Sequence, residues 1–254
     1  MPVPLATVFG GGGLFGIAYL LGVGEALIDR GVPLGEAPSL GTSAGSWAAA
    51  AFGLGVRWEE AISLFGEDIP RRPDPRRGRL RVSAATIFGE QRAPLMRAAV
   101  CSVPRLRRVV LSGVDTPVAD LIAASSAVPG LVSPHRVNGH WYVDGGVRSL
   151  VSADRGDDAE HLLVVAPIAG PMLGPAGRFA ERRLNREMEI WKRMHPLSQL
   201  SMIRPNRAIA DLARWPGHLF DNDRARRCYT LAYAQGTGIL ERWNAGPLGR
   251  TSGA

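Results

Sequence analysis

Leu5-Ala6-Thr7-Val8-Phe9-Gly10-Gly11-Gly12-Gly13-Leu14-Phe15-Gly16 stands near the start of the chain, and it decides the fold class. The apolar run Leu5–Phe9 predicts a short buried strand, because it is continuous and ends at glycines. Apolar residues at helical spacing follow in Ile17–Asp29, and Arg30 with Gly31 gives a stop signal for a helix. A strand, a glycine loop and a buried helix in succession are typical of an α/β layered protein.

Strands and helices continue to alternate downstream. Further strands are predicted at Pro38–Leu40, Met96–Val103, Arg107–Leu111, Trp141–Val143 and His161–Ala166. Further helices are predicted at Ser46–Leu54, Trp58–Phe65, Pro117–Ser126, Ala176–His195 and Cys228–Trp243, with a surface loop at Arg71–Arg81. We therefore predict one domain over residues 1–254. It is an α/β/α sandwich of three layers with a central, mostly parallel sheet, and residues 244–254 form a frayed tail.

Composition bounds the class of protein and its partners. The chain has 254 residues, 46% of them hydrophobic and 21% charged, which is enough for one domain with a buried core. Its net charge of +7 favours contact with anionic surfaces, including phospholipid headgroups. Zinc-ligand spacings, aromatic RNA-binding signatures and basic-region heptads are absent from the sequence, so we expect no nucleic-acid partner.

The cysteines and the amino-terminal region indicate the compartment. Cys101 and Cys228 are the only cysteines, which is too few for a disulfide framework and favours a reducing compartment. The first 24 residues are uncharged, but they lack a basic start and four glycines interrupt them. They therefore make a poor signal peptide or membrane span. We expect a cytoplasmic protein that can contact anionic membranes peripherally.

Gly41-Thr42-Ser43-Ala44-Gly45 matches the pattern Gly-x-Ser-x-Gly, in which a serine occupies a sharp turn between a strand and a helix. The turn lifts the hydroxyl clear of the sheet, and small flanking residues allow the turn to close. The positive end of the following helix favours a developing oxyanion. Ser43 is therefore the candidate nucleophile, although the pentapeptide alone is equally compatible with an ordinary turn of small residues.

The glycine loop at residues 10–13 has two candidate functions, because its backbone amides can approach either a phosphate or an oxyanion closely. Gly11, Gly13 and Gly16 formally fit a dinucleotide fingerprint. That interpretation requires an acidic residue about 20 positions later, at the end of a second strand, and Glu36 stands there in a poor context. A Walker lysine is absent as well. The oxyanion hypothesis is stronger, because the Ser43 motif lies one predicted helix downstream.

Asp144-Gly145-Gly146 follows the predicted strand Trp141–Val143, and alone it indicates only a turn. In combination with the other motifs, the chain resembles the patatin-like phospholipase family from Leu5 to about Pro167. The matching segments are the glycine loop Gly11–Gly16, the serine motif Gly41–Gly45, and the two stretches that approach the aspartate, Ala124–Gly130 and Asn138–Gly146. Residues 208–236 resemble the carboxyl-terminal part of bacterial members.

The resemblance implies a patatin-like fold and a Ser–Asp dyad that cleaves carboxylic esters of lipids. Ser43 is implied as the nucleophile, Asp144 as its base, and the amides of Gly11, Gly12 and Gly13 as the oxyanion hole. An aspartate with an ordinary pKa near 3.9 is a weak base for a serine hydroxyl. The dyad therefore requires burial to raise that pKa, or strong stabilisation of the oxyanion.

Two departures from the family pattern affect this hypothesis. Phe15 occupies the position where the family usually has Arg or Lys, so a cation beside the oxyanion loop is missing. This puts full activity in doubt. The segment Cys101–Val114 is abbreviated, which predicts a shallower wall on the substrate side.

Two other function classes stay open. An α/β-hydrolase triad would recruit a histidine after Asp144, and the sequence offers His161, His195 and His218. Alternatively, the chain is a catalytically impaired module that keeps the fold to bind membranes or proteins. Neither the dyad nor the triad requires a metal or an organic cofactor, and we expect none. The sequence does not define the oligomeric state.

Overall fold

The computed structural model describes residues 1–65, 73–74 and 76–245, and a mixed sheet forms its centre. The strand order is β5-β6-β3-β2-β1-β7-β8, and β4 also pairs with β3. The neighbouring pairs β3–β2, β2–β1, β1–β7 and β7–β8 are parallel. The pairs β3–β4, β3–β6 and β5–β6 are antiparallel. The strands are β1 (Val3–Phe9), β2 (Ser39–Thr42), β3 (Met96–Ser102), β4 (Arg107–Ser112), β5 (His135–Val137), β6 (His140–Asp144), β7 (Ala159–Val165) and β8 (Gln199–Ile203).

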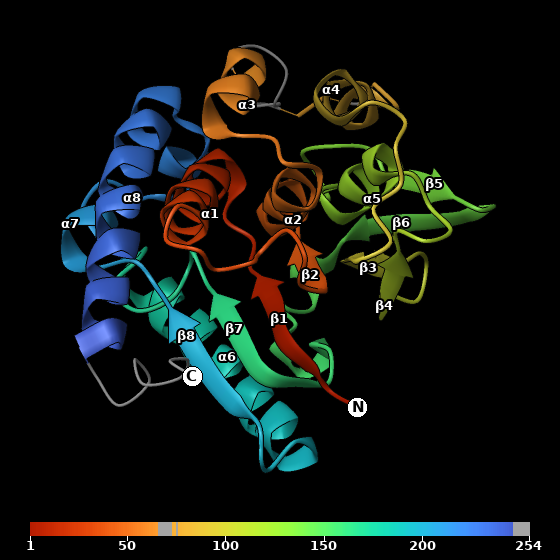
Figure 1. Ribbon diagram of the computed structural model, residues 1–254. Coiled ribbons are helices and arrows are strands. Elements are labelled where there is room, and N and C mark those ends of the chain that lie inside the picture. Colours follow the sequence, from red (N-terminus) through yellow and green to blue (C-terminus); the bar gives the residue numbers. More distant parts are fainter. Residues whose placement is uncertain (66–72, 75, 246–254) are drawn as a thin grey trace.

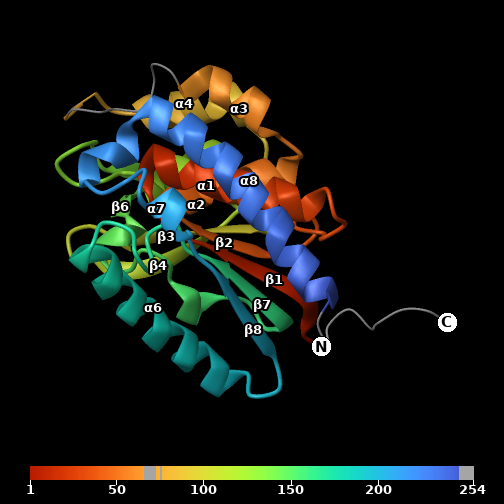
Figure 2. The ribbon, with the colours of Figure 1, turned by 90° about the vertical axis from the view of Figure 1, so that its left-hand side faces the viewer.

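Helices cover both faces of this sheet. Figures 1 and 2 show α1, α2, α5 and α8 over one face, with α3 and α4 further out, and α6 over the other face. The predicted three-layer α/β fold with a mostly parallel sheet is therefore confirmed. The helices are α1 (Gly13–Ile28), α2 (Ala44–Leu54), α3 (Trp58–Phe65), α4 (Arg79–Phe88), α5 (Val118–Ser125), α6 (Pro175–Met194), α7 (Arg207–Ala210) and α8 (Asn222–Ala245).

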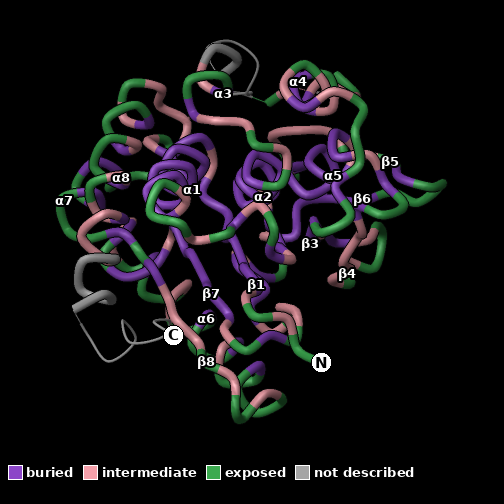
Figure 3. Tube along the Cα trace, in the orientation of Figure 1, coloured by how far each residue is buried: buried purple, intermediate pink, exposed green. Residues whose placement is uncertain are grey.

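Helix α1 lies at the centre of the larger layer. Every residue from Leu14 to Leu27 is buried, as expected for a helix that is mostly apolar on all sides, and Glu25 is the one charged residue among them. It is enclosed by the sheet, α2 and α8, and Figure 3 shows it as one of the most completely buried segments. Gly22 allows α8 to approach closely, because a Cβ there would lie 2.6 Å from the carbonyl oxygen of Tyr229.

Helix α6 covers the second face with one apolar stripe. Leu184 and Trp191 are buried in a cluster with Val8, Leu162 and Val164, which point from β1 and β7 to this side of the sheet. The remainder of α6 is mostly exposed and rich in arginine. The long charged helix predicted at Ala176–His195 is thereby confirmed, with one side buried and the other facing solvent.

The structure differs from the sequence prediction at three points. The loop predicted at Arg71–Arg81 is wrong at its end, because α4 begins at Arg79. Leu80, Ala84 and Phe88 are buried and carry the helical period, which the surrounding arginines obscure. The short strands β5 and β8 and the helix α7 were not predicted, because they contain few consecutive apolar residues. Of the predicted tail 244–254, residues 244 and 245 belong to α8, and residues 246–254 lie outside the described residues.

Within the described part of the chain, no helix is both long and apolar enough to span a bilayer.

Candidate active site

Strands β2 and β6 approach each other end to end along one edge of β3. Thr42, the last residue of β2, pairs with Ala99, and Asp144, the last residue of β6, pairs with Val100. Strand β4 pairs with residues 97–102 of β3 and therefore occupies the other edge. Because a strand has only two edges, β2 and β6 share one, and their carboxyl ends meet between Ala99 and Val100. This arrangement brings the segment after Thr42 to Asp144.

Ser43 occupies the turn between β2 and α2 in a strained backbone conformation. Its φ is 52° and its ψ is −118°, a region that non-glycine residues rarely adopt. Gly41 and Gly45 allow the turn to close, since a Cβ at Gly41 would lie 2.4 Å from the Gly45 carbonyl oxygen. A Cβ at Gly45 would lie 1.9 Å from the Phe9 carbonyl oxygen. The requirement for small residues around the serine therefore has a direct steric cause.

Hydrogen bonds from α5 and α2 hold the Ser43 backbone. Its N–H donates to the Ser125 hydroxyl at 2.9 Å, and that hydroxyl donates to the Ala99 carbonyl at 2.8 Å. The Ser43 carbonyl accepts from the hydroxyl of Ser46 at 2.6 Å. Ser125 is the last residue of α5 and is fully buried, so it ties the serine turn to β3 through one side chain. Sequence reasoning missed this residue, because a serine at a helix end has no distinctive signal.

Asp144 is buried beside Ser43, with 4% of its surface exposed. Burial raises its pKa to about 6, although hydrogen bonds from the Ser43 side chain and the Gly146 N–H both act to lower it. The Gly146 N–H donates to its Oδ1 at 2.6 Å, and the Asp144 N–H donates to the Ala127 carbonyl at 3.0 Å. Desolvation thus outweighs the hydrogen bonds, and the carboxylate becomes a stronger base than an exposed aspartate.

The glycine loop lies against Ser43, between β1 and α1. A Cβ at Gly11 would lie 3.4 Å from the Ser43 Cβ. The Gly11 N–H donates to the Leu150 carbonyl at 2.7 Å, so it is already engaged and is a poor oxyanion donor. Gly12 and Gly13 occupy the start of α1, where N–H groups lack partners within the helix. Ala44 begins α2 in the same way, so two helix amino termini meet at Ser43.

Phe15 lies inside the core rather than at the site. Its side chain is fully buried in α1, and its carbonyl accepts a weak hydrogen bond from the Cys228 thiol at 3.8 Å. The cation that the family pattern places here is absent, and this chain fills the position with apolar packing. Gly12 allows the loop to pack closely on α1, because a Cβ at Gly12 would lie only 2.8 Å from the α-carbon of Gly16.

The three histidines after Asp144 have other surroundings. His161 contacts the Ser201 hydroxyl at 2.9 Å, and His195 pairs with Asp158 at 3.0 Å. His218 lies in the 3-10 helix η3 (Pro216–Phe220) and does not line the cavity that contains Ser43. In the described structure, neither Ser43 nor Asp144 has a histidine as hydrogen-bond partner, which weakens the triad hypothesis.

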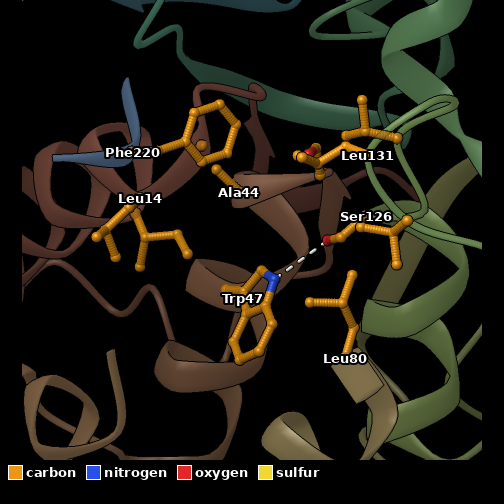
Figure 4. Close-up of a pocket in the computed structure, with 12 residues that line it drawn as sticks. Leu14, Ala44, Trp47, Leu80, Ser126, Leu131 and Phe220 are labelled. Carbon is orange, nitrogen blue, oxygen red and sulfur yellow. Dashed lines mark hydrogen bonds between the residues drawn. The ribbon is translucent and has the colours of Figure 1, made fainter. Parts of the chain in front are cut away.

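A small, mostly apolar cavity opens beside Ser43. Figure 4 shows Leu14, Ala44 and Trp47 on one side and Leu80, Ser126 and Leu131 on the other, with Phe220 at one end. The Trp47 indole donates to the Ser126 hydroxyl at 3.1 Å, which joins α2 to the end of α5 across the cavity wall. Such a surface suits an acyl chain. Across the described residues, no cluster of His, Cys, Asp and Glu could hold a metal ion.

Comparison with known proteins gives a family match over part of the chain. Residues 98–154 match the family model of patatin-like phospholipases. Over this segment the chain is similar to that family. This match supports a carboxylic ester hydrolase, and in general terms a lipid acyl hydrolase. The matched segment contains Asp144 and Ser125, whereas Ser43 and the glycine loop precede it.

No curated protein matches the chain significantly. Among solved structures, it is similar to the crystal structure of VipD from Legionella pneumophila, with a TM-score of 0.49 and 14% sequence identity. The alignment covers 95% of this chain and 67% of that chain.

Proposed function

We propose that this chain hydrolyses carboxylic esters of lipids, such as phospholipids, lysophospholipids or acylglycerols, through a Ser43–Asp144 dyad. The observation that carries the proposal is the meeting of β2 and β6 on one edge of β3, which places a strained, accessible serine beside a buried carboxylate. The family match over residues 98–154 supports a lipid ester as the substrate class.

The reaction proceeds in two halves. Asp144 accepts the hydroxyl proton as Ser43 Oγ attacks the ester carbonyl carbon, and the carbonyl oxygen becomes an oxyanion. The tetrahedral intermediate collapses, the leaving alcohol takes the proton from Asp144, and the acyl group stays on Ser43. Water then gives a proton to Asp144 and attacks the acyl-enzyme. Collapse releases the fatty acid and returns the proton to Ser43.

Two features of the site compensate for the weakness of an aspartate as a base. A pKa near 6 keeps Asp144 ionised at neutral pH while making it more basic than an exposed carboxylate. The amides at the start of α1 and α2 supply hydrogen bonds to the oxyanion, and each such donor is worth roughly 3–4 kcal/mol. We propose Gly12 and Gly13 as the principal donors within the glycine loop, with Ala44 beside them. The Gly11 amide serves to anchor the loop to Leu150.

Turnover of p-nitrophenyl butyrate tests this function. Ser43→Ala and Asp144→Asn are each expected to lower kcat by at least about a thousandfold, because members of one catalytic unit act together. His161→Ala, His195→Ala and His218→Ala are expected to retain activity. A collapse in one histidine variant that remains folded would favour the triad instead.

A catalytically impaired binding module is the second candidate, and Phe15 is the observation that favours it. The missing cation leaves the oxyanion loop without a charged neighbour, which could reduce turnover without affecting the fold. A wild-type protein that is folded but shows no activity above Ser43→Ala, on soluble and lipid esters alike, would support this candidate and contradict the hydrolase proposal.

A further inference from the structure

The 3-10 helix η3 forms one end of the Ser43 cavity. Its last residue, Phe220, lines the cavity together with Gly13 and Leu14. Its backbone also lies directly over the glycine loop, because a Cβ at Gly13 would meet the Leu219 carbonyl oxygen at 2.9 Å. The segment before α8 therefore connects the cavity to the outer surface of the molecule.

Trp215 stands at the outer end of this segment. It is 71% exposed, which is unusual for the largest side chain in proteins, and it directly precedes η3. A 3-10 helix rises about 2 Å per residue, so Trp215 lies within roughly 10 Å of Phe220 along the segment. An exposed tryptophan with an apolar body and one polar N–H is suited to the boundary between water and a bilayer.

The segment that contains Trp215 carries excess positive charge, although Arg204, Arg214 and Arg224 pair with carboxylates. Residues 204–227 contain six arginines and three aspartates. Arg207, Arg226 and Arg227 are exposed, and none of them pairs with a carboxylate among the described residues. Figure 2 shows α7 and the start of α8 at the same end of the molecule as the start of α1, where the cavity lies. An exposed tryptophan in an arginine-rich segment complements an anionic membrane surface better than a neutral one.

We propose that Trp215 and the arginines of residues 204–227 dock this chain on an anionic phospholipid bilayer, with the Ser43 cavity close to the lipid surface. The function of this docking rests on the proposed lipid hydrolysis, because docking through this segment places the cavity where an acyl chain can enter it. The docking itself is a binding property that does not require turnover.

Vesicle sedimentation tests the proposal. The full chain carries Ser43→Ala so that lipid is not consumed, and it is mixed with vesicles of phosphatidylcholine alone or with 30% phosphatidylglycerol, a composition on the order of that of anionic membranes. We expect binding to the anionic vesicles that weakens as salt is raised. Adding Trp215→Ala is expected to weaken this binding roughly tenfold, and Trp215→Phe to weaken it less. An unchanged melting temperature shows that each variant is folded.

Leu197→Ala is the matched control. Leu197 is 98% exposed and precedes β8, so it lies at the amino-terminal end of the parallel strands, whereas Ser43 follows a carboxyl-terminal end. Its replacement is therefore expected to leave vesicle binding unchanged. Equal binding of Trp215→Ala and the parent, or no binding to anionic vesicles, would overturn the docking proposal. Turnover of a soluble ester by the wild-type protein reports separately on the proposed hydrolase, so failure of one proposal is distinguishable from failure of the other.

Discussion

Thr42 and Asp144 end two strands that run toward each other along the same edge of β3, and they pair with its adjacent residues Ala99 and Val100. A parallel strand and an antiparallel strand therefore share one edge without overlapping. The junction places the residue after Thr42 beside the Asp144 carboxylate, although the two are about a hundred positions apart in the sequence. Backbone pairing, rather than a flexible loop, sets the distance between the proposed nucleophile and its base.

The first prediction concerns the pH dependence of activity. Burial raises the pKa of Asp144 to about 6, and only the ionised form can accept a proton from Ser43. We expect kcat/KM for a soluble ester to fall about tenfold per pH unit below about pH 6 and to be level above it. The measurement is a pH–rate profile between pH 4.5 and 8.5, with circular dichroism at each pH to confirm folding. A flat profile through this range would argue against Asp144 as the base.

The second prediction concerns the effect of the buried Asp144 carboxylate on the free energy of unfolding. Because the pKa of Asp144 is higher in the folded than in the unfolded protein, its contribution to stability is lost as pH rises from about 4 through about 6. Raising an aspartate pKa from its ordinary value to about 6 corresponds to about 3 kcal/mol. Asp144→Asn is therefore expected to be inactive and about 1–3 kcal/mol more stable than wild type at pH 8.

Urea unfolding at two pH values checks this expectation. The difference between Asp144→Asn and wild type should largely disappear at pH 4, where the aspartate is protonated in the folded state and about half protonated in the unfolded state. A variant that is less stable than wild type at pH 8 would contradict the desolvated environment described for Asp144.

The third prediction tests the steric basis of the serine turn. Gly45→Ala places a Cβ 1.9 Å from the Phe9 carbonyl oxygen, so β1 and α2 must separate. We expect the free energy of unfolding to fall by about 3 kcal/mol, with a loss of esterase activity. Gly53→Ala is the matched control in the same helix, because nothing lies within 4 Å of a Cβ there. That variant should gain up to about 1 kcal/mol, since alanine is the better helix former.

Much of the fold could be predicted from the sequence, because strong local signals define it. The continuous apolar run of β7, the mostly apolar α1 and the glycine loop each admit few alternatives. Strands β5 and β8 could not be predicted, since they have only three and five residues and are held by their neighbours rather than by their own composition. Their formation depends on pairing with β6 and β7, which no local pattern encodes.

The candidate site was predictable only in part. Ser43, Asp144 and the glycines were found by motif, but motifs do not report which backbone groups are already bonded. The Gly11 N–H contact with Leu150 and the Ser125 bridge both join residues more than eighty positions apart. Only the folded chain reveals that Gly11 anchors the loop and that Ser125 holds the serine turn.

The fourth prediction concerns Ser125 as a positioning residue. Ser125→Ala removes the acceptor of the Ser43 N–H and the link to Ala99. We expect kcat to fall by roughly tenfold with little change in KM, because a loss of about 1–3 kcal/mol in a buried hydrogen bond acts here on the geometry of the nucleophile. Ser126→Ala is the control. Its hydroxyl accepts from Trp47 in the cavity wall, so its removal should affect KM more than kcat. If Ser125→Ala and Ser126→Ala changed kcat and KM in the same proportions, the positioning role of Ser125 would be contradicted.

Covalent labelling tests the central claim most directly. The wild-type protein is treated with a fluorophosphonate probe, and the modified peptide is identified by mass spectrometry. The account predicts a single adduct on Ser43, formed at a rate that falls by at least about a hundredfold in Asp144→Asn, because the serine then lacks its base. An adduct on another serine, or labelling of Ser43 that proceeds equally fast without the Asp144 carboxylate, would contradict the dyad.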